Sequence, residues 1–309
     1  AGDAAVHIAA RCGHLAFLEM LAGLGVSFHQ RNAQALSPID LAGFQSSSAA
    51  DREALRRATF LLEPRLRTLV LYHEDFLEHT ARRPSDWEAP DRLLQIMQRL
   101  RDEQAFPSFQ AELSTQFEKA DVTLLGRTHS PDYLAFVNSL SKQLQQQHQR
   151  SSGAYSAEGG SRSQFVTPPL PFTPHVQKFL LRQSSEEMAQ KKQGSDTAFS
   201  TGTLNAARRA AGAVAFAVDR VLLGRNRNAF CVVRPPGHHA GYSGLLDGGN
   251  SCGFCIFNNV AAGALHALEE HHCERVAIVD LDIHHGNCDE GALLFTSTLT
   301  VFCVCRQRN

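Results

Sequence analysis

One short segment of the chain combines carboxylates and imidazoles at a spacing that suits metal binding. It reads Asp280-Leu-Asp-Ile-His-His and follows an apolar run over 275–279. Side chains two residues apart on a strand point the same way, so Asp280, Asp282 and His284 are predicted to share one direction. A carboxylate oxygen and an imidazole nitrogen are both ligands that zinc accepts. The segment therefore predicts a partial zinc site, and the alternative is a strand end capped by polar groups.

A second segment places two imidazoles where they could transfer protons. His238 and His239 lie behind a Pro-Pro-Gly turn, just after the strand-like run 229–233. Histidine titrates near neutral pH, so such a pair suits general acid–base catalysis. The pair His271-His272 follows Glu269-Glu270 near a predicted helix end. We predict that this later pair is solvated and has no chemical role.

The elements that must position these groups alternate along the chain. Apolar strand-like runs cover 68–72, 229–233, 275–280 and 299–304, and helical patterns cover 90–103, 130–148, 201–223 and 258–271. This alternation predicts an α/β fold with a parallel sheet covered on both faces. Ligands of such sheets gather at the carboxyl ends of strands, where both histidine segments lie. Residues 141–195 are rich in Gln, Ser, Gly and Pro, which predicts a partly disordered surface insertion.

The N-terminal residues contain a degenerate repeat. Ala5-Val-His-Ile-Ala-Ala is answered by Pro38-Ile-Asp-Leu-Ala-Gly, an offset of 33 residues. This pattern resembles the ankyrin repeat, with one nearly complete unit and the start of another; a simple helical hairpin is the alternative. We predict an ankyrin repeat segment over 1–46, a linker helix over 47–65 and an α/β domain over 66–309.

Composition limits the classes of partner. The 309 residues carry a formal net charge of −1, which gives no basic field for nucleic acid. No run approaches the roughly 20 apolar residues that cross a bilayer, so neither nucleic acid nor a membrane is an expected direct partner. The eight cysteines come with no visible secretory signal. We expect free thiols and a nuclear or cytoplasmic location.

From about Leu69 to Arg306 the chain resembles the arginase-like histone deacetylase family, in the branch with Arg-Pro-Pro-Gly-His-His-Ala. The matching segments keep the family's order: 72–79, 82–92, 129–133, 196–213, 234–240, 253–259 and 280–287. The resemblance implies a three-layer αβα parallel-sheet fold. It also implies zinc-dependent hydrolysis of acetyl-lysine in histones or other proteins, so acetylated histone tails are the expected substrate.

The resemblance assigns a catalytic role to several residues. Asp282 and His284 would be two of three ligands of the zinc ion, Zn2+. His239 would be the general base that activates the attacking water, and His238 its electrostatic partner. Asp280 would accept a hydrogen bond from His238. The chemistry is consistent, because zinc lowers the pKa of bound water to about 7.

The remaining roles concern the surroundings of the catalytic groups. Asn287 would lie behind His239 and fix its tautomer. The Gly253 carbonyl would contact the substrate amide, and Phe254 would form a wall of the acyl-lysine tunnel. Asp196 would hold the substrate backbone at the rim. Family members also bind a potassium ion, K+, beside the residues that correspond to Asp280, Asp282 and His284.

The chain also departs from the family pattern. The third zinc ligand, from an Asp-Ala motif, and the carbonyl-polarising Tyr, from a Gly-Gly-Tyr loop, do not occur in the 309 residues. Cys288 and Asp289 replace a usual Gly-Thr pair, and residues 303–306 read Cys-Val-Cys-Arg in place of Ser-Leu-His-Arg. We therefore expect this polypeptide to bind zinc weakly or not at all and to be inactive by itself. A longer parent protein with the missing segments would be an active deacetylase.

Three alternatives stay open. Cys252 and Cys255 could combine with Cys303 and Cys305 in a structural zinc site, although the second pair is too closely spaced. The substrate could be a polyamine, as for an acetylpolyamine amidohydrolase. The chain could also be a scaffold without catalysis, in which the ankyrin repeats recruit a protein partner.

Overall fold

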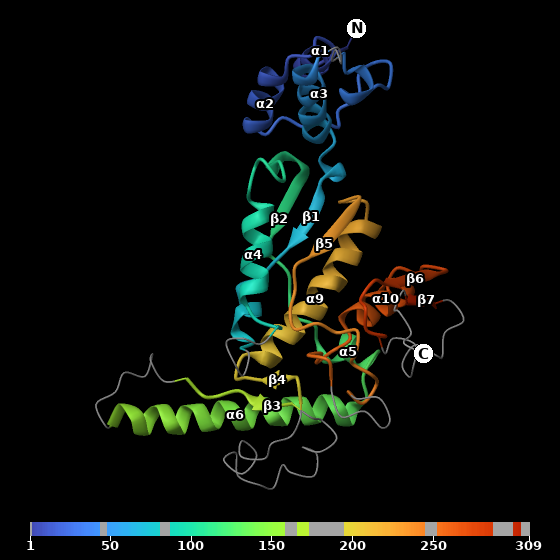
Figure 1. Cartoon of the computed structure of the whole chain (residues 1–309). Helices are drawn as coiled ribbons and strands as arrows, with labels where there is room; N and C mark the ends of the chain where they lie inside the picture. The colour runs from blue at the N-terminus through green and yellow to red at the C-terminus, as the bar shows by residue number, and fades with distance from the viewer. Residues whose placement is uncertain are drawn as a thin grey trace. The chain divides into compact units, whose positions relative to one another are not determined.

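The computed structural model describes residues 2–43, 48–80, 87–157, 166–172, 195–244, 252–286 and 299–303 (Figure 1). The chain forms two compact units. Unit 1 comprises Ala1–Val70, Gln98–Leu113 and Leu223–Phe230; unit 2 comprises Leu71–Met97, Ser114–Leu222 and Cys231–Asn309. Two later segments thus join unit 1, so this division differs from the three consecutive domains that we predict, and those boundaries stay a prediction.

Three helices form the N-terminal part of unit 1: α1 (Ala5–Arg11), α2 (Leu15–Gly23) and α3 (Ala49–Leu62). Their apolar faces share one core that includes Val6, Leu18, Leu21, Ala58 and Leu62. The predicted helical pair over 5–23 is therefore present. The predicted linker helix is also present, but it packs into this core and is not a free connection.

A buried histidine connects the first helix to the loop after α2. His7 is 1% exposed, its Nδ1 accepts a hydrogen bond from the Ala4 backbone N–H, and its Nε2 lies 3.1 Å from the Gln30 carbonyl oxygen. One imidazole thus caps α1 and fixes the following loop. The short 3₁₀ helix η1 (Ile39–Leu41) returns the chain to the same core, where Ile39 packs.

A three-stranded sheet has the order β2-β1-β5. Its strands are β1 (Thr68–Leu71), β2 (Ala111–Ser114) and β5 (Asn228–Cys231), with short 3₁₀ helices at Pro64–Leu66, Glu74–Glu78 and Ser108–Gln110. The predicted strands over 68–72 and 229–233 correspond to β1 and β5. The sequence did not predict β2, because the apolar–polar alternation in Ala-Glu-Leu-Ser covers only four residues, the shortest run that indicates a strand.

Unit 2 contains a large aromatic and aliphatic core. The helices of this unit are labelled in Figure 1. They are α5 (Val122–Gly126), α6 (Pro131–Ala157), α9 (Thr203–Leu222) and α10 (Asn259–Glu269); α4 (Asp91–Leu100) crosses the division between the units. Four buried residues of α6, Leu134, Val137, Leu140 and Leu144, pack with Phe172 and Phe199 beside the antiparallel pair β3 (Leu170–Pro171) and β4 (Ala198–Phe199).

The predicted insertion over 141–195 is wrong in its first part. Helix α6 continues to Ala157 without a break, and Leu144 and Ser152 are buried. The glutamines of 145–147 are good helix formers, so a Gln-rich composition by itself does not indicate disorder. Residues 158–165 and 173–194 of the predicted insertion lie outside the described residues.

The carboxyl-terminal strands give the fold its parallel pair. β6 (Val276–Asp280) runs parallel to β7 (Leu299–Cys303), with Val276 opposite Leu299 and Asp280 opposite Cys303. Helix α10 covers β6 through Leu265, which packs with Ile278. This is the predicted α/β arrangement. Within the described residues the strands fall into three separate sheets, and Val279 is 58% exposed where the sequence predicted a fully buried strand.

Among the described residues, no helix has both the length and the apolar character that crossing a bilayer requires.

The packing of α3 can be tested by truncating one side chain. Leu62 is 2% exposed in the shared core, so Leu62→Ala should reduce the free energy of unfolding of unit 1 by about 2–5 kcal/mol. The control, Leu24→Ala, changes a side chain that is 72% exposed and should have little effect. Urea unfolding followed by circular dichroism measures both. Equal effects would show that α3 does not pack in this core.

Candidate functional site

A hollow of about 990 Å³ in unit 2 gathers the predicted site residues. Its lining includes the predicted residues Asp196, His238, His239, Gly253, Phe254, Asp280, Asp282 and His284, together with Trp87, Glu88 and His285. They come from segments more than 100 residues apart in the sequence. Asn287 lies outside the described residues. Every predicted site residue that the structure describes therefore faces one hollow.

The two adjacent histidines lie against the end of β6. His238 Nδ1 is 2.9 Å from Asp280 Oδ2, and their side chains are 19% and 13% exposed. The rings of His238 and His239 have centroids 4.0 Å apart. Because the carboxylate only accepts, His238 donates from Nδ1, which leaves its Nε2 as the acceptor in the neutral form. Gly286 allows this pair to be covered, since a Cβ there would press on Asp280 Oδ2.

The two proposed metal ligands meet at the open side of the hollow. Asp282 Oδ1 accepts a hydrogen bond from the His284 backbone N–H at 2.8 Å and lies 2.9 Å from His284 Nδ1. Burial raises the pKa of Asp282, but the hydrogen bonds from His284 and the charges of His238 and His284 outweigh it, so the pKa is lowered. The side chains of Asp282 and His284 are 47% and 66% exposed.

This pair fits part of a zinc site. Two ligand atoms 2.9 Å apart can both reach an ion at Zn–O and Zn–N distances of about 2.0–2.2 Å with small adjustments. Within the described ranges, no third His, Cys or carboxylate side chain lies close enough to complete a three-ligand group with them. The described residues thus supply an incomplete ligand set of the expected type.

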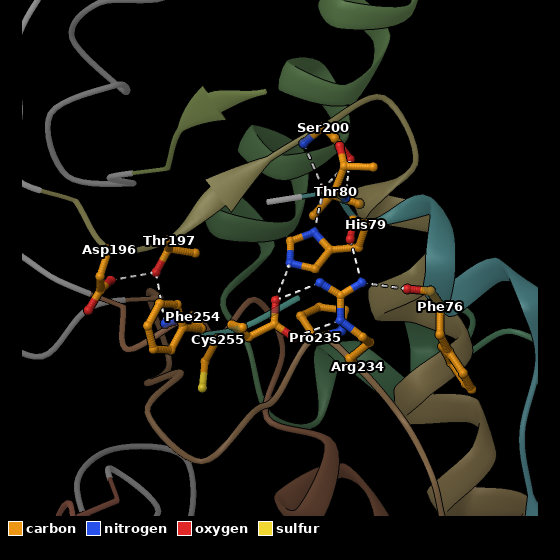
Figure 2. A network of polar contacts seen from close by, with 12 residues as sticks. Phe76, His79, Thr80, Asp196, Thr197, Ser200, Arg234, Pro235, Phe254 and Cys255 are labelled. Carbon is orange, nitrogen blue, oxygen red and sulfur yellow. Dashed lines mark hydrogen bonds and ion pairs between the residues drawn. The ribbon is translucent and has the colours of Figure 1, made fainter. Parts of the chain in front are cut away.

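The floor of the hollow is built from a close contact between a glycine and an imidazole. Gly253 has φ +51°, and a Cβ there would overlap the ring of His239. The next residue, Phe254, donates its backbone N–H to Thr197 Oγ1 at 2.9 Å, and that hydroxyl donates to Asp196 Oδ1 at 2.8 Å (Figure 2). Asp196 and Phe254 are therefore coupled through Thr197, which the sequence analysis missed because a lone threonine has no distinguishing pattern.

The two cysteines beside this floor, Cys252 and Cys255, are buried. Cys255 Sγ accepts from the His239 backbone N–H at 3.5 Å and donates to the Gly253 carbonyl at 3.2 Å. Burial raises the pKa of the Cys252 thiol well above its usual range. Cys305 and the side chain of Cys303 lie outside what the structure describes. The alternative four-cysteine site is therefore untested.

A buried ion pair anchors the segment that precedes the two histidines. Arg234, 2% exposed, donates from Nε and Nη2 to the two carboxylate oxygens of Glu88, both at 2.7 Å. Its Nη1 donates to the carbonyls of Phe76, at 2.8 Å, and His79 (Figure 2). His79 in turn contacts Glu88 through Nε2 and Thr203 Oγ1 through Nδ1. This network joins the Pro-Pro-Gly-His-His segment to the first turn of α9.

Burial and hydrogen bonding shift the pKa values of Glu88 and His79 in this network. Burial alone would raise the pKa of Glu88, but hydrogen bonds from His79 and Arg234 overcome it and lower the pKa to about 2. Burial also lowers the pKa of His79. Neither Glu88 nor His79 is predicted from the sequence as a structural partner of Arg234. The nearest signal was an arginine next to two prolines, which does not identify a partner 146 residues away.

A second buried histidine orders the loops on which the site residues lie. His129 Nδ1 is 3.0 Å from the Gly241 carbonyl oxygen, and its Nε2 accepts the backbone N–H of Asn258 at 2.9 Å. Burial lowers the pKa of His129 to about 4, so it is neutral at pH 7. Tyr133 adds a hydrogen bond from its hydroxyl to the Ile256 carbonyl at 2.7 Å. These contacts hold the segments after His239 and after Gly253 side by side.

These segments of the fold match one protein family. The histone deacetylase domain family matches residues 86–305, which include every predicted site residue. The chain belongs to this family. The relatives below are named deacetylases, so the family is one of deacetylase-type hydrolases.

Three known proteins illustrate the similarity. Type-2 histone deacetylase 1 of Dictyostelium discoideum is 33% identical over 231 residues, which is 74% of this chain and 15% of that protein. Human polyamine deacetylase HDAC10 is 32% identical over 228 residues, 71% of this chain and 26% of that protein. The crystal structure of the HDA15 HD domain has a TM-score of 0.56 at 25% identity, covering 78% of this chain and 54% of that chain. The matched region thus spans only a minor part of the length of the Dictyostelium deacetylase and of human HDAC10.

The pKa of Glu88 gives a test by acid unfolding. Its folded pKa of about 2 lies below the usual glutamate value of 4.5, so its ionised form stabilises the fold above pH 4.5. That contribution is lost as the pH falls from 4.5 to 2, and amounts to roughly 3 kcal/mol. Glu88→Gln should lower stability at pH 7, where Arg234 loses its partner, and its difference from the wild type should shrink with acid. Urea unfolding at several pH values measures this difference. The control is Glu274→Gln, which changes a glutamate on the surface. A difference between Glu88→Gln and the wild type that does not depend on pH would contradict the ion pair.

The contact between Gly253 and His239 gives a second test. Gly253→Ala should lower the melting temperature, because alanine at φ +51° costs about 1–2 kcal/mol and its Cβ overlaps the imidazole. The matched control is Gly126→Ala, since a Cβ at Gly126 meets no atom within 4 Å. Thermal unfolding and the His239 ring signals in NMR spectra are measured for both. If Gly253→Ala changes neither, the ring does not lie on this glycine.

Proposed function

We propose that the chain carries the base and two metal ligands of a zinc-dependent deacetylase that hydrolyses acetyl-lysine in proteins. The observation that carries this proposal is the single hollow onto which His238, His239, Asp280, Asp282 and His284 converge. A paired imidazole next to an imidazole–carboxylate ligand pair is the set that metal-assisted amide hydrolysis needs. Membership of the histone deacetylase domain family supports the same reaction.

Asp282 and His284 would hold the zinc ion. When bound, zinc polarises the amide carbonyl and makes hydroxide available at neutral pH by lowering the pKa of its water to about 7. The exposed position of this pair supports its role, since a substrate and a water molecule need access to the same point. A potassium ion near Asp280, Asp282 and His284 belongs to the same proposal.

His239 would move the proton. Its ring centroid lies 6.1 Å from that of His284, close enough for a water molecule to lie between the base and the ligand. His239 takes the proton from the attacking water at a ring nitrogen and returns it to the departing lysine amine. His238, held by Asp280, stabilises the positive charge that His239 acquires. Asn287 is proposed to orient His239 from behind.

The substrate would enter beside the Phe254 ring. The Gly253 carbonyl, which accepts a hydrogen bond from Cys255 Sγ, would accept the substrate amide N–H with its second lone pair. Asp196, held by Thr197, can accept backbone N–H groups at the rim of the hollow. An acyl-lysine on a histone tail offers both groups, so we propose acetylated protein tails as the substrate. The chain would act in the nucleus, the cytoplasm or both.

Two further assignments belong to this proposal. The segment over residues 1–46, which includes α1 and α2, is proposed to be an ankyrin repeat segment that recruits a protein partner. An acetylated polyamine is the second candidate substrate, because human HDAC10, a polyamine deacetylase, is 32% identical over most of this chain. The alternative of a scaffold without catalysis makes the opposite prediction for turnover.

The reaction is tested by acetate release from the full-length protein, meaning these 309 residues together with the segments that would supply the third zinc ligand and the carbonyl-polarising Tyr. It should deacetylate an acetyl-lysine peptide faster than an acetylated polyamine, and chelation of zinc should abolish release. His239→Asn should reduce kcat by about 10²–10⁴-fold because the general base is lost. The matched control, His272→Asn, changes an exposed histidine and should keep full activity. No release from either substrate with zinc present would favour the scaffold.

The ligand set of the 309 residues makes a separate prediction. With Asp282 and His284 as its only family ligands, this polypeptide should bind zinc weakly at this site and show no turnover. Isothermal titration with zinc, compared between the wild type and Asp282→Asn, isolates the contribution of this site. A nanomolar affinity that Asp282→Asn abolishes would contradict the prediction.

A further inference from the structure

A second group of metal-ligand side chains lies where the ends of α9 and α10 meet. Asp219 is in the last turn of α9, His266 is in the last turn of α10, and His271 follows α10. Asp219 Oδ1 lies 2.7 Å from the Nε2 atoms of both histidines. The sequence predicted that His271 and His272 are both solvated. That prediction is wrong for His271, which is 17% exposed, and correct for His272.

The geometry of this group is compact. One potential ligand atom from each of the three side chains lies within 4.8 Å of the other two. In the part of the chain that the structure describes, no other three His, Cys or carboxylate side chains meet this condition. The His266 and His271 rings stand edge to face, with centroids 5.6 Å apart, and the Nε2 atoms of both rings face the Asp219 carboxylate.

The group borders a hollow other than the one described above. This second hollow, of about 1010 Å³, is lined by Asp219 and His266, and by Arg127, Phe216 and Glu270. The two imidazoles are mostly buried, at 16% and 17% exposed, whereas Asp219 is 40% exposed. Two ligands are thus held by packing, while the third faces solvent. An ion here would keep open positions for water on the side of the hollow.

We propose that Asp219, His266 and His271 bind a divalent metal ion of the zinc type. Two imidazole nitrogens and one carboxylate oxygen form a set that zinc prefers and that magnesium and calcium do not. The ion takes the place of the protons that the two Nε2 atoms now share with Asp219. This site is separate from Asp282 and His284, and the proposal does not depend on the proposed deacetylase function.

Arg127 sets the tautomer of His266, and its positive charge and N–H donor oppose the binding of a metal ion. Its Nη1 lies 3.4 Å from His266 Nδ1, and a guanidinium only donates, so His266 carries its proton on Nε2. A neutral imidazole that binds metal through Nε2 must carry its proton on Nδ1, which would then face the arginine N–H. Arg127 also contacts Glu269, at 2.9 Å, and Glu270. These carboxylates can hold the guanidinium when it withdraws from His266.

The ion would act as a clamp between two helices of the scaffold. Helix α9 begins at Thr203, whose hydroxyl contacts His79 of the Arg234 network, and α10 packs on β6, at whose end Asp280 lies. Binding at the far ends of α9 and α10 would therefore stabilise the helices that position the first site. Zinc should raise the melting temperature of the protein by mass action.

The test removes the first site so that only the second one reports. In full-length Asp282→Asn/His284→Asn protein, equilibrium dialysis against buffered zinc should retain about one ion per chain at the α9–α10 site. Adding His271→Asn should remove that ion and the zinc-dependent rise in melting temperature. The matched control is His272→Asn, which changes the neighbouring exposed histidine; asparagine tolerates its φ of +53°. Circular dichroism without metal checks that each variant is folded.

Two outcomes would overturn the proposal. One is zinc binding that is equal in the His271→Asn and His272→Asn variants. The other is absence of bound zinc in the double variant with both histidines intact. Arg127→Gln provides an independent arm, since loss of the opposing charge and donor should tighten zinc binding. Weaker binding by this variant would contradict the assigned geometry, and a zinc-dependent shift of the His266 Nε2 resonance in NMR spectra would support it.

Discussion

The buried pair of Arg234 and Glu88 is the constraint on which the site depends. A charge cannot be removed from water without a partner, and loss of one member of a buried pair typically costs about 3–5 kcal/mol. Each of the three guanidinium nitrogens of Arg234 donates to a carboxylate or a backbone carbonyl. The position of the arginine therefore determines where the chain enters the Pro-Pro-Gly turn. His238 and His239 follow that turn directly.

The same network connects the turn to the rest of the scaffold. His79 lies between Glu88 and Thr203, and the Ser200 hydroxyl bridges Thr203 and the Glu78 carbonyl. On the other side of the histidines, His129 joins the Gly241 loop to Asn258. Two buried histidines, each neutralised or paired by its surroundings, thus hold the proposed proton-transfer residues from both sides. The burial of His79 and His129 contrasts with the exposure of Asp282 and His284.

Histidines in this chain have roles that follow from burial and partners. His7 caps a helix, His129 and His79 order loops, and His266 with His271 shares one carboxylate. The adjacent pairs His238-His239 and His271-His272 look alike in the sequence. In both pairs an aspartate meets the first histidine, Asp280 in one and Asp219 in the other. The pairs differ in the second histidine, because His239 lines the hollow with Asp282 and His284, whereas His272 is exposed. Each of these carboxylates lies more than 40 residues away along the chain.

Much of the fold and of the site could be predicted from the sequence. The continuous apolar runs over 68–72 and 275–280, and the helical patterns of α9 and α10, follow from local burial periods. The period-2 spacing of Asp280, Asp282 and His284 indicated a partial metal site, and the resemblance of the ordered motifs indicated the family and the other residues that line the hollow. What only the tertiary structure decided were the long-range polar pairs: Arg234 with Glu88, Phe254 with Thr197, and Asp219 with two histidines. Hydrophobic periodicity is a local property of the chain, whereas the partner of a buried charge or imidazole is selected by which segments the fold brings into contact, and no local pattern encodes that choice.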